Sequence, residues 1–259
     1  MEKPPSFCQR LSEESKGSHD RSDKFISVRA ATAFGSRTIW ASLVADFYHV
    51  YATIEDLIAK LAAKNVKEGE ALNIPDLFRK QAFLDDIAYF YNGDKGRVEK
   101  VVKEGAERRA VKYYVERIKD KTAENPAFLI PYAHSMYLAL MAGGSVLKRM
   151  LVKTMGLPPT GEGTSIFTFP SDPDALKVTL KARIDELAAN YSPELLADLC
   201  EEKRLGFLLN DTIVGRVPFD WQGGARVVIA AAFHPISLCA MAVAAILAAL
   251  LYYRRSLFS

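Results

Sequence analysis

The sequence predicts an all-α domain followed by a transmembrane helix. Apolar residues recur at three- and four-residue intervals through most of the chain, and no alternating strand pattern runs longer than a few residues. The segment 227–253 contains no formally charged side chain, and about 20 apolar residues are enough to cross a bilayer. With 259 residues, 49% of them hydrophobic, the chain is long enough to bury a sizeable core.

The apolar periodicity predicts about seven or eight helices. Segment 38–64 shows the pattern most clearly, because Ile39, Leu43, Phe47 and Val50 begin a stripe along one side of a helix. After an N-terminal helix, the predicted helices are 38–64, 77–91, 97–121, 127–155, 175–191 and 193–214.

Turn-forming and capping residues set the predicted boundaries. Asn-Gly at 92–93 and Asn-Pro at 125–126 interrupt the periodic pattern, and Gly105 favours a break within 97–121. Asp174 and Ser192 stand where an N-cap is expected, since their side chains can accept a hydrogen bond from the first helical turn. A connector at 156–174, rich in glycine, proline, serine and threonine, predicts a structured loop.

Composition excludes several classes of protein. The formal net charge is +3, from 34 basic and 31 acidic residues, which is too small and too evenly mixed for a nucleic-acid-binding surface. Cys8, Cys200 and Cys239 share no metal-binding spacing and form no disulfide framework. The first 24 residues contain no apolar stretch long enough for a signal peptide, so we expect most of the chain to face the cytosol.

The apolar segment at the C-terminal end predicts a tail anchor. Its end carries Tyr252 and Tyr253 at the expected interfacial depth, with Arg254 and Arg255 beyond them. A buried C-terminal helix is the alternative, but a helix this apolar on every face would need protein on all sides. The expected organisation is a flexible N-terminus at 1–10, a helical domain at 11–215, a linker at 216–226, a transmembrane anchor at 227–253 and a short tail at 254–259.

Two adjacent glycines, Gly143 and Gly144, interrupt the apolar helix predicted over 127–155. Each glycine in a helix interior costs roughly 0.5–1 kcal/mol relative to alanine. The bare backbone allows close approach by another helix or by a flat ligand, and the surrounding apolar and aromatic residues are suited to either.

Five stretches resemble motifs of the heme oxygenase family, and they occur in the family's order between about 11 and 213. The stretch at 133–150 is similar to the family's distal helix, which bends over the heme. The five are DFYHVYATIEDLI at 46–58, FRKQAFLDDIAYFYNG at 78–93, AHSMYLALMAGGSVLKRM at 133–150, LPPTGEGTSIFTFP at 157–170 and FLLN at 207–210.

The resemblance implies a fold and an activity. It implies a heme oxygenase-like multi-helical domain in which heme b is both cofactor and substrate. O₂ and electrons from NADPH, delivered by a flavoprotein reductase, would convert the heme to biliverdin, ferrous iron and CO. We expect a membrane partner through the C-terminal helix and no nucleic acid, with the protein anchored in the endoplasmic reticulum membrane and its catalytic domain facing the cytosol.

The resemblance also implies an iron ligand. The stretch SKGSHDRSDKF aligns His19 with the family's proximal histidine, although local composition alone would make His19 an exposed surface residue. Asp23, four residues later, can help to orient the ring. His134 stands where the family has a tyrosine that reaches a heme propionate, and it is the chief rival ligand. His49 lies within an apolar stripe, so we expect a satisfied core histidine.

Further site residues follow from the same motifs. Tyr51 and Asn210 match positions that hold water on the distal side, and Gly143 and Gly144 match glycines that pack over the ring. The remaining heme contacts implied by the resemblance are Phe207 as an aromatic wall, Arg183 and Lys16 as partners of the propionates, and Ala139 and Leu140 on the distal helix.

Five positions depart from the family's pattern. Leu140 replaces the distal aspartate, Ala139 a glycine and Met136 an arginine of the same network, while Ser12 and Thr179 replace basic residues that hold the propionates. A leucine offers no hydrogen-bond donor or acceptor, so we expect slow or poorly regioselective cleavage. The alternative is a non-catalytic, membrane-anchored heme buffer or sensor, and a third possibility is the same fold without heme.

Overall fold

The computed structural model describes residues 5–158 and 160–218, and these contain helices and no strand. This confirms the predicted all-α class. The described α-helices are α1 (Phe7–Glu14), α2 (Lys16–Phe34), α3 (Arg37–Ala62), α4 (Lys67–Leu72), α5 (Lys80–Phe90), α6 (Lys95–Glu107), α7 (Arg109–Glu124), α8 (Leu129–Met155), α9 (Pro173–Ala188) and α10 (Pro193–Gly215). Three 3₁₀ turns accompany them, η1 (Pro75–Leu77), η2 (Pro126–Phe128) and η3 (Ser165–Phe167).

The ten α-helices of the described ranges exceed the predicted seven or eight. The prediction missed α4, which has 6 residues and is too short to show a helical apolar period. It also placed the start of the folded domain at residue 11, whereas α1 begins at Phe7 and buries both Phe7 and Cys8. Ser6 begins α1 by accepting a hydrogen bond from the amide of Gln9.

Helix starts are fixed by side-chain caps, and one prediction of a cap was wrong. Ser192 accepts from the amide of Leu195, as predicted. The cap of α9 is Asp172, which accepts from the amide of Ala175, and Asp174 lies inside the first turn. Pro173 explains the earlier start, because its fixed φ suits the first position of a helix and its missing N–H is not needed there.

The predicted break near Gly105 is confirmed at Arg108, whose extended backbone separates α6 from α7. Gly105 itself lies where α6 crosses α3, since an added Cβ would lie 3.1 Å from the carbonyl oxygen of Ala45. Next to it, the Nε2 atom of His49 lies 2.8 Å from the carbonyl oxygen of Val102. His49 is therefore the satisfied core histidine that the sequence predicts.

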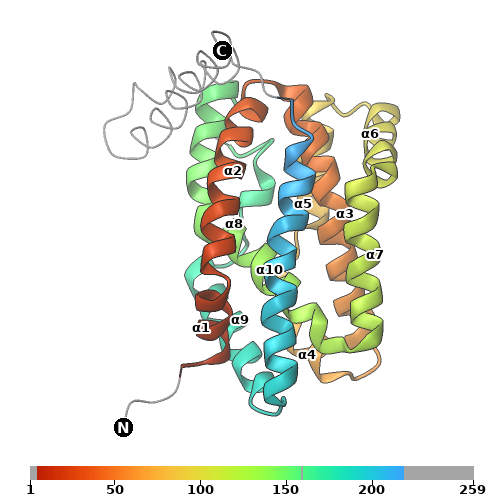
Figure 1. Ribbon diagram of the computed structural model, residues 1–259. Coiled ribbons are helices and arrows are strands. Elements are labelled where there is room, and N and C mark those ends of the chain that lie inside the picture. The colour runs from red at the N-terminus through yellow and green to blue at the C-terminus, as the bar shows by residue number, and fades with distance from the viewer. Residues whose placement is uncertain (1–4, 159, 219–259) are drawn as a thin grey trace.

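The long helices α2, α3, α7, α8 and α10 run side by side along the molecule, with α4 at one end and α6 at the other (Figure 1). Helix α3 packs against α4, α5, α6 and α7, and α10 packs against α2, α7 and α8. The buried side chains form one hydrophobic core between these helices. This arrangement brings α2, α8 and α10, which carry most of the predicted site residues, into mutual contact.

Among the described residues, no helix is both long and apolar enough to cross a membrane. The predicted anchor at 227–253 lies outside the described residues, and so it stays a prediction.

Candidate functional site

The structure brings His19 of α2 and Phe207 of α10 together. Their ring centroids are 5.5 Å apart, and the rings meet edge to face with an interplanar angle of 86°. The His19 side chain is 59% exposed, and its Nδ1 atom lies 3.6 Å from Oδ1 of Asp20. The nearby carboxylate is therefore that of Asp20 and not that of Asp23, which was expected to orient the ring. An imidazole held at its edge and open to solvent is free to bind a ligand.

Gly143 and Gly144 of α8 have different surroundings. A Cβ atom on Gly143 would meet no described atom within 4 Å, whereas one on Gly144 would lie 3.1 Å from Cδ1 of Phe167. The Phe167 ring in turn stacks on Trp40 of α3, with centroids 6.4 Å apart. The bare backbone at Gly144 is thus explained by a contact within the chain, and the bare backbone at Gly143 is open to a flat ligand.

Buried polar atoms mark the side of α8 predicted to be distal. The Tyr51 hydroxyl donates a 2.8 Å hydrogen bond to the carbonyl oxygen of Met136, and burial raises the pKa of this hydroxyl well above its ordinary value. Oδ1 of Asn210 and Oγ of Ser135 are buried without a protein partner in the described part of the chain. Leaving such an atom unsatisfied costs about 1–3 kcal/mol, so Asn210 and Ser135 are suited to bind water or a ligand.

The three departures on α8 differ in exposure. Leu140 is partly buried against the hydrophobic core, whereas Ala139 is exposed. Met136 is buried, with its sulfur 3.9 Å from the Tyr114 hydroxyl. None of the three side chains supplies a carboxylate or guanidinium.

The two basic residues expected near the propionates lie on different helices. Lys16 is exposed at the first position of α2. Arg183 of α9 donates from Nη1 to the carbonyl oxygens of Ala71 and Asn73, each 3.3 Å away. These bonds tie α9 to the end of α4 through one nitrogen of the guanidinium.

His134 of α8 is 1% exposed, and neither ring nitrogen has a partner in the described residues. Burial, together with the nearby cations Lys203 and Lys181, lowers the pKa of its imidazole to about 3. The ring is therefore neutral at physiological pH, with a lone pair available. His134, the rival iron ligand, is thus buried, whereas His19 is exposed.

Lys203 of α10 is a residue that the sequence analysis missed. It is 5% exposed and donates from Nζ to the carbonyl oxygen of Leu11, 3.1 Å away. Burial lowers the pKa of its ammonium group to about 8. A signal was present in the sequence, because a lysine interrupts the stripe of small and apolar residues at 199, 200, 206 and 207 that faces the neighbouring helices.

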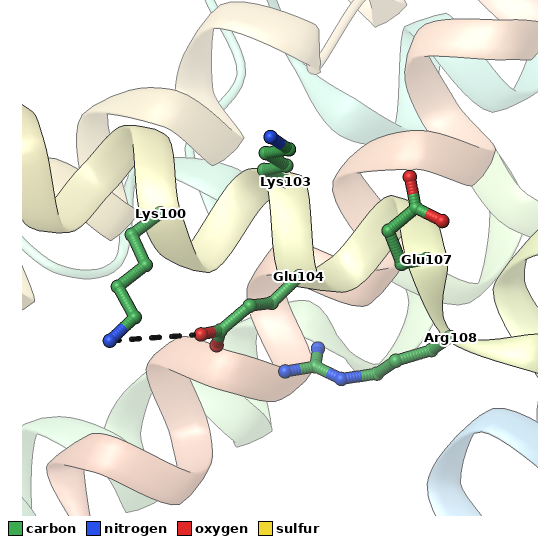
Figure 2. A pocket seen from close by; sticks show the side chains of 5 residues that line it. All are labelled: Lys100, Lys103, Glu104, Glu107 and Arg108. Atoms are coloured by element: carbon green, nitrogen blue, oxygen red, sulfur yellow. Dashed lines mark ion pairs between the residues drawn. The ribbon is translucent and has the colours of Figure 1, made fainter.

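A shallow hollow elsewhere on the surface contains none of the predicted site residues. It lies along α6 and is lined by Lys100, Lys103, Glu104, Glu107 and Arg108 (Figure 2). Lys100 and Glu104 pair across one turn at 3.9 Å, and Arg108 is bound to Asp46. Opposite charges that already pair on one helix indicate a solvated face.

The residues around α2, α8 and α10 fit a heme. The exposed imidazole of His19 suits an iron atom, the open backbone of Gly143 allows a flat ring to approach, and the Phe207 ring supplies an apolar wall. The unpartnered polar atoms of His134 and Asn210 give such a ligand hydrogen-bonding groups.

Sequence comparison identifies relatives of this chain. A sequence model of the heme oxygenase family matches residues 5–216. The rat protein heme oxygenase 1 is 32% identical over 178 residues, which are 68% of this chain and 58% of the rat protein. Human heme oxygenase 1 is 29% identical over 213 residues, which are 80% of this chain and 70% of the human protein.

Solved structures share the fold. The crystal structure of heme oxygenase 2 from Chlamydomonas reinhardtii without heme has a TM-score of 0.75 at 23% identity and covers 83% of this chain and 99% of that one. The crystal structure of heme oxygenase-1 from the cyanobacterium Synechocystis, in complex with heme, has a TM-score of 0.72 at 22% identity. It covers 88% of this chain and 96% of that chain. With the family model matching most of its length, this chain belongs to the heme oxygenase family.

Proposed function

We propose that this protein is a heme oxygenase that cleaves heme to biliverdin, ferrous iron and CO. The observation that carries the proposal is the pairing of His19 and Phe207 on α2 and α10, next to α8 with its open backbone at Gly143. A family member with this arrangement offers an imidazole to the iron and bare backbone to the porphyrin ring. The family membership supports heme degradation.

Each site residue has a role in the proposal. When bound, the heme supplies both the iron that activates O₂ and the carbon that is oxidised. His19 would bind the iron through its imidazole, Phe207 would pack on the ring, and the open backbone at Gly143 would let the ring approach α8. Asn210 and Ser135 would hold water, and Tyr51 fixes the Met136 carbonyl through its hydrogen bond.

The proposed reaction needs partners that are not part of this chain. Electrons come from NADPH through a flavoprotein reductase, and O₂ is the oxidant. We further propose that the apolar segment 227–253 anchors the protein in the endoplasmic reticulum membrane with the helical domain in the cytosol. A reductase in the same membrane would then be held at a high effective concentration.

Turnover of the heme complex tests the proposal. The full-length protein in detergent is loaded with heme and mixed with NADPH and a flavoprotein reductase in air. We expect loss of the heme Soret absorbance and the appearance of biliverdin in the extracted product. A stable Soret band while NADPH is consumed, with no biliverdin, contradicts the proposal.

That contrary outcome defines the second candidate function, a non-catalytic heme buffer or sensor. Leu140 favours it, because a half-buried leucine offers no hydrogen bond to water or to an iron ligand on the distal side. A protein that binds hemin tightly and leaves it intact under these conditions is a buffer or sensor. A protein that takes up no hemin has the fold without the heme function.

A further inference from the structure

We propose that Lys203 and His134 form a buried carboxylate-binding site between α1, α8 and α10, and that a heme propionate occupies it. The inference rests on the proposed function, since the porphyrin is the expected source of the carboxylate. It adds a binding residue, Lys203, that the sequence resemblance does not supply.

Lys203 is a buried cation without a counter-ion. Its ammonium group is bonded to the Leu11 carbonyl oxygen, and it forms no ion pair with a carboxylate in the described residues. The ionisable groups that act on it are the cation of Lys181 and the thiols of Cys8 and Cys200, whose pKa values are raised by burial so that they stay uncharged at neutral pH. A buried ammonium is stable only when its charge is compensated, and two of its three N–H groups remain for an incoming anion.

His134 lies in the same positive environment. The two charged groups that act on its ring are Lys203 and Lys181, and neither ring nitrogen has a partner in the part of the chain that the structure describes. A neutral imidazole can donate one hydrogen bond to a carboxylate oxygen. An anion between Lys203 and His134 would therefore compensate the charge of Lys203 and give a hydrogen-bond partner to a ring that has none among the described residues.

The pair is connected to the candidate iron ligand through one aromatic ring. The Lys203 Nζ atom lies 6.0 Å from the centroid of the Phe207 ring, and the His19 ring centroid lies 5.5 Å from the same centroid. Lys203 precedes Phe207 by one turn of α10. A macrocycle that binds His19 through its metal and packs on Phe207 would thus direct a carboxylate at its edge toward Lys203.

Lys203 also lies close to Ser12, a position where the family's pattern has a basic residue and this chain does not. The partner of Lys203, the carbonyl of Leu11, directly precedes Ser12, where the resemblance implies a basic side chain that holds a propionate. The other lost basic position, Thr179, is two residues from Lys181 on α9. Lys203 brings an ammonium from α10 to the part of α1 that no longer supplies one.

Porphyrin binding in the absence of iron chemistry tests the site. Full-length protein in detergent is titrated with protoporphyrin IX and with its dimethyl ester, and binding is followed by fluorescence. We expect Lys203→Met to weaken binding of the free acid by roughly tenfold to a hundredfold, because a charge-assisted hydrogen bond is lost. Binding of the dimethyl ester should not change. Arg204→Met is the matched control, since Arg204 is adjacent but pairs with Glu201, and it should bind both porphyrins like the wild type.

The outcomes separate this inference from the proposed function. If the wild type binds neither porphyrin, the proposed function fails. If the wild type binds the free acid and Lys203→Met binds it equally well, the carboxylate site is refuted while heme binding stands. A third outcome is that acetate stabilises the wild type while Lys203→Met binds porphyrin as tightly as the wild type does. The site would then bind free carboxylates, and the assignment to a heme propionate would be overturned. A melting temperature of Lys203→Met at or above that of the wild type shows that the variant folds.

Discussion

Gly143 and Gly144 are neighbours in sequence, but the structure gives each a different reason to lack a side chain. An added Cβ meets nothing described at Gly143 and meets the Phe167 ring at 3.1 Å at Gly144. Phe167 has little room to move, because it is 8% exposed and stacked on Trp40. The cost of glycine in a helix is therefore offset by packing at Gly144, whereas no contact with the described residues requires glycine at position 143.

This difference predicts opposite effects of alanine at the two positions. Gly143→Ala should raise the free energy of unfolding of the heme-free protein by about 0.5–1 kcal/mol, because alanine is the better helix former. The same variant should bind heme more weakly. Gly144→Ala should be less stable than Gly143→Ala, as measured by denaturant unfolding. Equal stability of the two variants and unchanged heme affinity of Gly143→Ala would refute this account.

Leu140 predicts a limit on the reaction. If heme binds as proposed, the side chain at position 140 supplies no hydrogen bond to water near the iron, and we expect the position of attack on the ring to be poorly controlled. Leu140→Asp should accelerate biliverdin formation and narrow the distribution of biliverdin isomers, as measured by chromatography. Met141→Asp is the control, because Met141 is buried in the core and its replacement should only destabilise the fold. A wild type that already forms one isomer rapidly would contradict the prediction.

At the scale of elements, the loop between α8 and α9 is held by one carboxylate of α5. Asp86 is fully buried and accepts hydrogen bonds from the amides of Ser165 and Ile166, at 2.7 Å and 3.0 Å. These amides begin η3, which carries Phe167 onto α8. Gly163 allows the close packing, because its φ is +78° and an added Cβ would lie 2.7 Å from the Tyr89 ring.

The buried carboxyl of Asp86 predicts a pH dependence of stability. Burial raises its pKa from 3.8 to about 6, so between these values the folded protein binds more protons than the unfolded chain. The stability contributed by the protonated group is fully present below about pH 4 and is lost as the pH rises through about 6, at a slope of up to about 1.4 kcal/mol per pH unit.

Unfolding by denaturant at pH 4 to 8 measures this contribution. The difference in unfolding free energy between the wild type and Asp86→Asn should change between pH 4 and 6 and be constant above pH 7. Asp85→Asn is the matched control, because Asp85 is exposed on the same helix. The difference in unfolding free energy between the wild type and Asp85→Asn should be small across the same pH range. Parallel pH profiles for the wild type and Asp86→Asn would contradict the assignment.

At the scale of the whole molecule, Asp46 of α3 joins distant parts of the chain. Its buried carboxylate accepts hydrogen bonds from Arg108, at the junction of α6 and α7, and from Arg216, after α10. Both guanidinium groups also donate to Ser42. Arg29 of α2 adds a 2.6 Å bond to the carbonyl of Val217. The exit of the chain from α10 is thus fixed to α2 and α3.

The double variant Arg108→Met with Arg216→Met should lower the free energy of unfolding by about 3–5 kcal/mol, since it leaves a buried carboxylate uncompensated. Asp46→Ala should cost less, because the two arginine side chains are 23% and 30% exposed and can reach water. Thermal or denaturant unfolding measures both. An Asp46→Ala variant less stable than the double variant would refute this account.

Most of the fold was predictable because long helices carry a long apolar period. Helices α3, α8 and α10 were predicted to within a few residues, and the capping role of Ser192 was predicted from its position before Pro193. Helix α4 was not predictable, since it is too short to repeat a pattern. The start of α9 was missed because two aspartates, Asp172 and Asp174, compete for the cap.

The site was less predictable than the fold. His19 and Phe207 could be proposed only through the resemblance, because neither has a distinctive local pattern, whereas the glycine pair at 143–144 was distinctive in the sequence itself. Lys203 was missed because a lysine in a helix is usually solvated, although it interrupts an apolar stripe of α10 and is buried in the structure. The partners of Arg183 and Tyr51 are backbone carbonyls, which no sequence pattern reveals.

The absorption and electron paramagnetic resonance spectra of the heme complex test the central claim most directly, which is that the imidazole of His19 binds the iron of a heme lying against Gly143. The account predicts that His19→Ala loses the histidine-ligated spectrum while retaining heme, that added imidazole restores it, and that His134→Ala keeps it. A His19→Ala spectrum identical to that of the wild type, with the change appearing in His134→Ala, would contradict the account.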